Sequence, residues 1–136
     1  MTFALVLLIA FADITAVKSE PDLEKRSELA LAGADHAIDE AKQAYNNGND
    51  QAQHAALIEV QQFVEACYEA LEHSNKNPRR SKYYKNAELH LRALLRRLNS
   101  FRDQVSFDGR EAVDAVIKRV SDVHDELLSA IMSKKK

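Results

Sequence analysis

The sequence predicts an all-α protein, an antiparallel up-down four-helix bundle that follows an N-terminal hydrophobic segment. The 136 residues include only 3 Gly and 2 Pro, too few for an all-β domain, which requires a turn roughly every 8–12 residues. Apolar residues also recur at alternating steps of three and four over four stretches of similar length, which is the spacing by which helices pack in bundles. With 46% hydrophobic and 29% charged residues, the chain has enough apolar material for one core.

The chain begins with an unbroken apolar run, FALVLLIAFA at residues 3–12, which Asp13 ends. This run is too short for a bilayer span of about 20 residues, but it is typical of the hydrophobic region of a secretory signal. We therefore expect a signal peptide over residues 1–16, cleaved after Ala16, although no Lys or Arg precedes the run. The domain of residues 17–136 would then be exported, to the periplasm or outside the cell. The alternative is a buried additional helix in a cytoplasmic protein.

Two helices are predicted in the first half, over residues 21–46 and 50–74. Pro21 suits the first position of a helix, where its missing N–H is not needed. Between the two helices, Gly48 can take the positive φ of a turn. The first helix has alanines at 30, 34, 37, 41 and 44, with Leu31, Ile38 and Tyr45 beside them. Such small residues predict close packing against one neighbouring helix. The apolar seam of the second helix is Leu57, Val60, Val64, Cys67 and Leu71.

Two further helices are predicted over residues 82–105 and 108–132. Ser81 is the expected N-cap of the first of them, and Asp108 with Glu111 forms a capping-box pattern for the second. The seam of the third helix is Tyr84, Ala87, Leu91, Leu94, Leu98, Phe101 and Val105. The seam of the fourth is Val113, Val116, Val120, Val123 and Leu127. Such seams are of the coiled-coil type and suit a monomer or a homodimer equally well.

Charge is divided unevenly along the chain. Residues 20–74 carry 12 acidic and 3 basic side chains, whereas residues 76–102 carry 9 basic and 1 acidic. The simplest interpretation is that an acidic helical hairpin neutralises a basic helix within one bundle. Flanking charges of this kind also select which helices become neighbours.

The motifs of several chemistries are missing. None of the 5 His follows a carboxylate by three residues, as the Glu-x-x-His ligands of di-iron bundles do. No two His stand four apart, so a helical zinc pair is excluded. A haem site would need an inward-facing His, for which His124 beside its seam is the candidate. Cys67 lies on a seam and is interpreted as a small buried hydrophobe. We expect no cofactor, no metal and no enzymatic activity.

One local stretch has a distinct chemical character. Residues 76–85 hold five basic side chains and two adjacent tyrosines, and further arginines follow along the third helix. Such side chains neutralise phosphates and stack on bases, so the stretch is a candidate anion-binding or partner-binding surface. The alternative is that these residues only pair with the acidic hairpin. The candidate contacts are Lys76, Arg79, Arg80, Lys82, Tyr83, Lys85, Arg92 and Arg96.

The stretches KNPRRSKYYKNAELHLRALLRRLNSFRDQVSFDGRE and VHDELLSAIM, about a third of the chain, resemble small exported bacterial all-helical proteins. That resemblance implies no activity, cofactor or catalytic residue. The function predicted from the sequence is therefore a non-enzymatic binding or scaffold module of the cell envelope, with a protein as its partner. The alternative is a binder of an anionic polymer or a nucleic acid through the basic loop and the third helix, although export would make nucleic acid a less favourable natural target.

Overall fold

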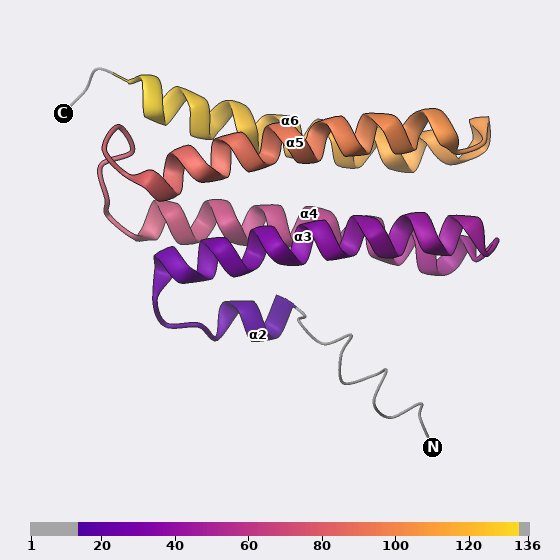
Figure 1. Cartoon of the computed structure of the whole chain (residues 1–136), viewed down its shortest axis with the longest axis horizontal. Coiled ribbons are helices and arrows are strands. Elements are labelled where there is room, and N and C mark those ends of the chain that lie inside the picture. The colour runs from indigo at the N-terminus through magenta and orange to yellow at the C-terminus, as the bar shows by residue number, and fades with distance from the viewer. Residues whose placement is uncertain (1–13, 134–136) are drawn as a thin grey trace.

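The computed structural model describes residues 14–133, which form an all-helical structure with four long packed helices (Figure 1). The predicted signal segment lies outside the described residues except for residues 14–16. The long helices closely follow the predicted spans, and each lacks only a residue or two at one end. They are α3 (Leu23–Asn46), α4 (Asp50–His73), α5 (Lys82–Gln104) and α6 (Arg110–Met132), preceded by the short α2 (Ile14–Lys18) and with a 3₁₀ turn, η1 (Phe107–Gly109), before α6.

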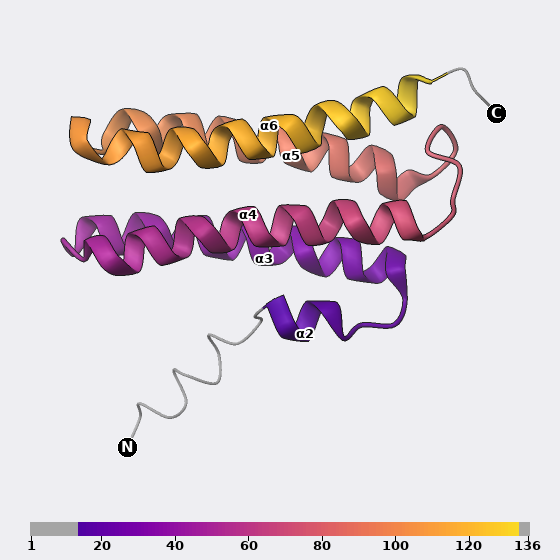
Figure 2. The same ribbon diagram turned by 180° about the vertical axis from the view of Figure 1, so that it is seen from behind.

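The helices form two antiparallel hairpins, α3/α4 and α5/α6, that pack side by side (Figures 1 and 2). Helix α5 lies next to α3 and helix α6 next to α4, whereas α4 and α5 barely touch. Ion pairs give the register between the hairpins: Asp35 and Asp39 of α3 meet His90 and Arg97 of α5 respectively. Residue numbers rise together along this pair, so α3 and α5 run parallel. The expected antiparallel order therefore holds within each hairpin and not between them.

The link between α4 and α5 explains this arrangement. It crosses the diagonal of the bundle, which is about 14 Å for helices packed about 10 Å apart. Residues 74–81 cover that distance easily at about 3.3 Å per residue. The two other links are tighter: at the first, Gly48 adopts a φ of 71°, as the turn predicts. Because the long link permits either arrangement, the contacts between helix faces select the diagonal one.

The core is built from the predicted seams. Every seam residue of α4, α5 and α6 is buried, as is Val105 directly after α5. On α3 the five alanines named above, Leu31 and Ile38 are buried, while Tyr45 is partly buried and packs edge-on against Phe101 with the ring centroids 5.9 Å apart. Helix α3 packs most closely against α4, which confirms the prediction from its small residues.

Two helix starts differ from the prediction. Helix α3 begins at Leu23 with Asp22 as its N-cap, because the Asp22 carboxylate accepts hydrogen bonds from the backbone N–H of Glu24 and Lys25. Pro21 therefore lies outside the helix. Asp108 lies in η1, and Gly109 occupies the cap position of α6 without any side-chain hydrogen bond. The predicted capping box is wrong because the 3₁₀ turn starts the chain reversal earlier. Ser81 caps α5 as predicted, with hydrogen bonds from the N–H of Tyr83 and Tyr84.

Helix α2 lies on the side of α3 and α4 that faces away from α5 and α6 (Figures 1 and 2). Its Val17 side chain is buried between those two helices. Residues 14–18 thus cover one part of the groove between α3 and α4. No helix within the described stretch is both long and apolar enough to cross a membrane.

Candidate binding surface

The basic loop between α4 and α5 is held in a defined conformation. The Asn77 side chain accepts a hydrogen bond from the Arg79 N–H at 3.0 Å, and the Asn77 carbonyl accepts from Arg80 and Ser81 at 3.0 and 2.9 Å. Just before this turn, Asn75 takes a positive φ of 61°, which Asn tolerates better than most residues. Because the backbone is fixed in this way, the side chains of Arg79 and Arg80 project outward and are exposed.

The start of α5 is anchored to the end of α4. The Tyr84 hydroxyl, which is buried, donates a hydrogen bond to the Leu71 carbonyl at 3.2 Å. The neighbouring Tyr83 is only partly buried, and the Lys82 ammonium lies 5.4 Å from the centre of its ring, within the range of a cation–π interaction. The two tyrosines of the predicted contact stretch therefore differ. Tyr84 belongs to the core, and Tyr83 belongs to the surface.

Helical geometry continues the basic loop along one face of α5. Lys82, Lys85, Leu89, Arg92 and Arg96 are spaced by alternating steps of three and four, so they share one stripe of the helix. All five are exposed, and the Leu89 side chain is 56% exposed. We define the basic surface as this stripe together with the loop residues Lys76, Arg79 and Arg80 and with Tyr83. Leu89 was not predicted as part of it, although the spacing alone places it there.

A small hollow of about 240 Å³ lies within the basic surface. Lys76, Arg80, Lys82 and Tyr83 line it, together with Glu24 from the start of α3. The sequence did not indicate Glu24 because it comes from a helix that only the fold brings beside α5. The hollow thus combines three cations, one aromatic ring and one carboxylate, which is a mixed donor set and not a purely cationic one.

Other arginines are used inside the molecule. Arg97 pairs with Asp39 and, at 3.5 Å, with Asp35 of α3. Arg102 pairs with Asp114 of α6. These contacts confirm that a basic helix is neutralised by its neighbours, but only in part. Within residues 14–133, Arg97 and His90 are the only side chains of the 76–102 stretch that form ion pairs with the acidic hairpin.

The predicted contact residues divide accordingly. Within the described chain, no ion pair involves Lys76, Arg79, Arg80, Lys85 or Arg96. Arg92 is different: its guanidinium is half exposed but bonds Glu88 one turn earlier, at 2.6 and 2.8 Å. The positive charge of the basic surface therefore resides mainly in the loop, the first turn of α5 and Arg96.

A buried polar cluster lies beneath the stripe. The Glu88 carboxylate, 7% exposed, receives hydrogen bonds from Arg92 and from His124 Nε2 of α6, the latter at 2.8 Å. Burial alone would raise the pKa of Glu88, but the hydrogen bonds from His124 and Arg92 outweigh it and hold the pKa below its ordinary value. Because His124 Nε2 is hydrogen-bonded to Glu88, this histidine links α6 to α5. The sequence singled out His124 but not its partner.

Cys67 lies in the core, whereas His36 lies at the surface. The Cys67 thiol is fully buried, and burial raises its pKa to about 12, so it stays protonated and unreactive at neutral pH. His36 is exposed beside Glu40. Over residues 14–133, no three His, Cys, Asp or Glu side chains lie close enough together to hold a metal ion.

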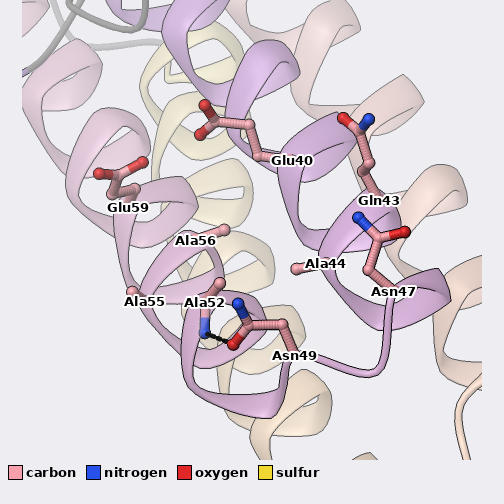
Figure 3. Close-up of a pocket in the computed structure, with 9 residues that line it drawn as sticks. All are labelled: Glu40, Gln43, Ala44, Asn47, Asn49, Ala52, Ala55, Ala56 and Glu59. Atoms are coloured by element: carbon pink, nitrogen blue, oxygen red, sulfur yellow. Dashed lines mark hydrogen bonds between the residues drawn. The ribbon is translucent and has the colours of Figure 1, made fainter. Parts of the chain in front are cut away.

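A larger groove of about 390 Å³ lies between α3 and α4 near the turn that joins them. Figure 3 shows the methyl groups of Ala44, Ala52 and Ala56 along it, with the carboxylates of Glu40 and Glu59 on opposite walls. This groove therefore has the opposite charge to the basic surface. An anionic ligand is repelled there and attracted to α5.

Protein-family models, curated proteins and solved structures were compared with the chain, and none of them matches it. The function is therefore argued from the side chains described above.

Proposed function

We propose that this protein is a non-enzymatic binding module that docks an acidic segment of a partner protein on the basic surface. One observation supports the proposal above all: most cations of this surface form no ion pair with any residue that the structure describes, whereas Arg97, Arg102 and Arg119 each pair with a carboxylate. Surface charge that no internal partner neutralises steers complementary partners toward the surface.

The mixed character of the surface favours a protein over a polymer. Leu89 lies exposed in the middle of the stripe, and Tyr83 borders the hollow. Exposed apolar and aromatic groups among arginines are typical of protein interfaces. Glu24 in the hollow repels phosphates, whereas a track for a nucleic acid or another polyanion is continuously positive.

Arg96 and Arg97 provide a matched test because they are neighbours on α5, but among residues 14–133 only Arg97 takes part in ion pairs. We expect the double variant Arg80→Ala/Arg96→Ala to bind an acidic, leucine-containing peptide about tenfold more weakly, since two charge-assisted contacts are lost. Its free energy of unfolding should be unchanged. Arg97→Ala should do the reverse: peptide affinity stays the same, and stability falls by about 0.5 kcal/mol because a partly exposed ion pair is removed.

Fluorescence anisotropy with the peptide, and urea unfolding of the same samples, measure both effects. A single-stranded oligonucleotide of equal charge serves as the competing ligand. For each tenfold rise in salt concentration, the logarithm of its binding constant falls by about 0.7 per phosphate contact. If the oligonucleotide binds more tightly than the peptide, the natural ligand is an anionic polymer and not a protein. Equal loss of stability in Arg96→Ala and Arg97→Ala would show that the basic residues serve only the fold.

We also propose that the module is exported to the cell envelope. The support is the apolar run of residues 3–12 and the small residue Ala16 after it. Native mass spectrometry of protein made in a bacterial host tests this: a chain that starts at Val17 supports export, and an uncut chain in the cytoplasm overturns it. The same spectrum reports whether the protein is a monomer or a homodimer.

A further inference from the structure

A second pocket lies at the opposite end of the bundle from the basic loop, where α4 and α6 begin (Figure 1). Its volume is about 250 Å³. The side chains of Asp50, Gln53 and His54 reach it from the first turns of α4, and Asp108 reaches it from η1. Leu57, Ala112 and the ring of Tyr45 provide apolar wall.

Gln53 is the unusual residue of this pocket. It lies four residues before Leu57, so it continues the seam of α4 toward the start of that helix. The other positions of the seam carry apolar side chains. Its side chain is buried, with 7% of the residue exposed, and it lines the pocket without a hydrogen-bond partner for its amide among residues 14–133. Its amide atoms are not cut off from solvent, so they open into the pocket and are free to hydrogen-bond to a ligand there.

The charge of the pocket indicates which ligand. Asp50 and Asp108 both carry carboxylates at its rim, and neither takes part in an ion pair within the described chain. Both lie in the first turn of a helix, where acidic residues are favoured, but no Lys or Arg lines the pocket to balance them. His54 is the remaining ionisable neighbour besides the Tyr45 phenol, whose hydroxyl donates to the Gln104 carbonyl.

We propose that this pocket binds a primary ammonium group on a short alkyl chain. The ammonium donates its three hydrogens to the carboxylates of Asp50 and Asp108 and to the amide oxygen of Gln53. The methylene groups pack against Leu57 and Ala112. A metal ion fits less well, because the described residues provide no three ligating side chains close together. The pocket holds the volume of about eight waters at about 30 Å³ each, which accommodates a chain of the length of a lysine side chain.

The ammonium group has two possible sources, a free amine or a lysine of a peptide, and the experiment separates them. The probes are 1,5-diaminopentane and acetyl-Gly-Lys-Gly-amide, titrated into the full chain while the side-chain amide signals of Gln53 are followed by NMR. A shift of these signals by the diamine alone assigns the pocket to a free amine. A shift by both probes assigns it to a lysine side chain as well.

Three variants decide the proposal. Asp108→Asn should weaken binding about tenfold, since one charge-assisted hydrogen bond is lost. Gln53→Leu, in which binding is followed by the backbone amide signals of Leu57 and Ala112, should abolish binding, and a cooperative urea transition shows that the variant folds. Asp103→Asn is the control, because Asp103 is exposed at the same end of the bundle but does not line the pocket.

The proposal is overturned if neither probe shifts the Gln53 signals. It is also overturned if Asp103→Asn weakens binding as much as Asp108→Asn, because the amine is then attracted only by the general charge of this end. Neither result depends on the basic surface of α5, because none of its residues lines this pocket.

Discussion

The two hairpins of the bundle bury their apolar faces with side chains of different sizes. In the first hairpin, α3 buries mainly alanines and Gly33, and the ring of Phe63 from α4 lies directly over that glycine. In the second hairpin, both helices bury larger side chains, such as Leu94, Leu98 and Val120, and the Glu88–His124 pair links them. The α3 and α4 backbones can approach closely because little lies between them.

This difference determines which kind of substitution destabilises each hairpin. A contact made of small residues has no room for additional atoms, so it is sensitive to enlargement. A contact made of large residues leaves a cavity when one is truncated, so it is sensitive to loss. The same two hairpins also differ in charge, and the ion pairs between α3 and α5 set their parallel register.

The largest effect is expected from truncation in the second hairpin. Leu94 is fully buried on α5, and Leu94→Ala should lower the free energy of unfolding by about 2–5 kcal/mol. The matched control is Leu89→Ala on the same helix, because Leu89 is 56% exposed and its change should stay within about 0.5 kcal/mol. Urea unfolding followed by circular dichroism measures both. Similar values for the two variants would contradict the packing of α5.

Enlargement in the first hairpin should have the next largest effect. A Cβ atom at Gly33 would lie 2.5 Å from Cε1 of Phe63, and the Phe63 ring is buried at 4% exposure. Gly→Ala within a helix normally stabilises by about 1 kcal/mol. Here we expect Gly33→Ala to destabilise by about 1–2 kcal/mol, because overpacking exceeds that gain.

A second variant tests the cause of this loss. Gly33→Ala/Phe63→Leu removes the ring that the new methyl group meets, so the alanine should cost less in that background than in the wild type. Thermal unfolding of the wild type, the two single variants and the double variant gives the coupling free energy between the two substitutions. A Gly33→Ala protein more stable than the wild type would show that the hairpin has room for the added methyl group.

The seams were predictable because they depend only on local periodicity. Each seam residue of α4, α5 and α6 is buried as predicted, and the Ser81 cap needs only the residues that follow it. The diagonal link was not predictable in this way. A seam states which face of a helix is buried but not which neighbour covers it, and the pairing of Arg97 with Asp39 becomes visible only once the register is known.

The binding surface was predictable to a similar extent. Lys76, Arg79 and Arg80 follow from composition, and Leu89 could have been found by helical spacing from Lys85. Glu24 could not, because it lies in another helix and reaches the hollow only through the fold. Arg92 was predicted as a contact without regard to Glu88, whose burial requires the position of α6.

The last of these effects concerns the polar part of the second hairpin. Glu88→Gln keeps the shape of the side chain but removes its charge, so the hydrogen bonds from His124 and Arg92 weaken. We expect a loss of about 1–2 kcal/mol at pH 7. Because the folded-state pKa of Glu88 is lowered, the wild type has this stabilisation above the unfolded pKa of about 4.3 and loses it as the pH falls through the folded value.

The difference in the free energy of unfolding between the wild type and Glu88→Gln should therefore be largest at neutral pH and should become smaller under acid conditions. We call this difference the gap. Urea unfolding at pH 7 and at pH 3 measures it, with Glu28→Gln as the control because Glu28 is exposed on α3. A gap that stays constant over this range would mean that Glu88 contributes through shape alone. A narrowing gap means that a charged group stabilises the second hairpin, and among the four long helices the first hairpin buries no carboxylate in its described core.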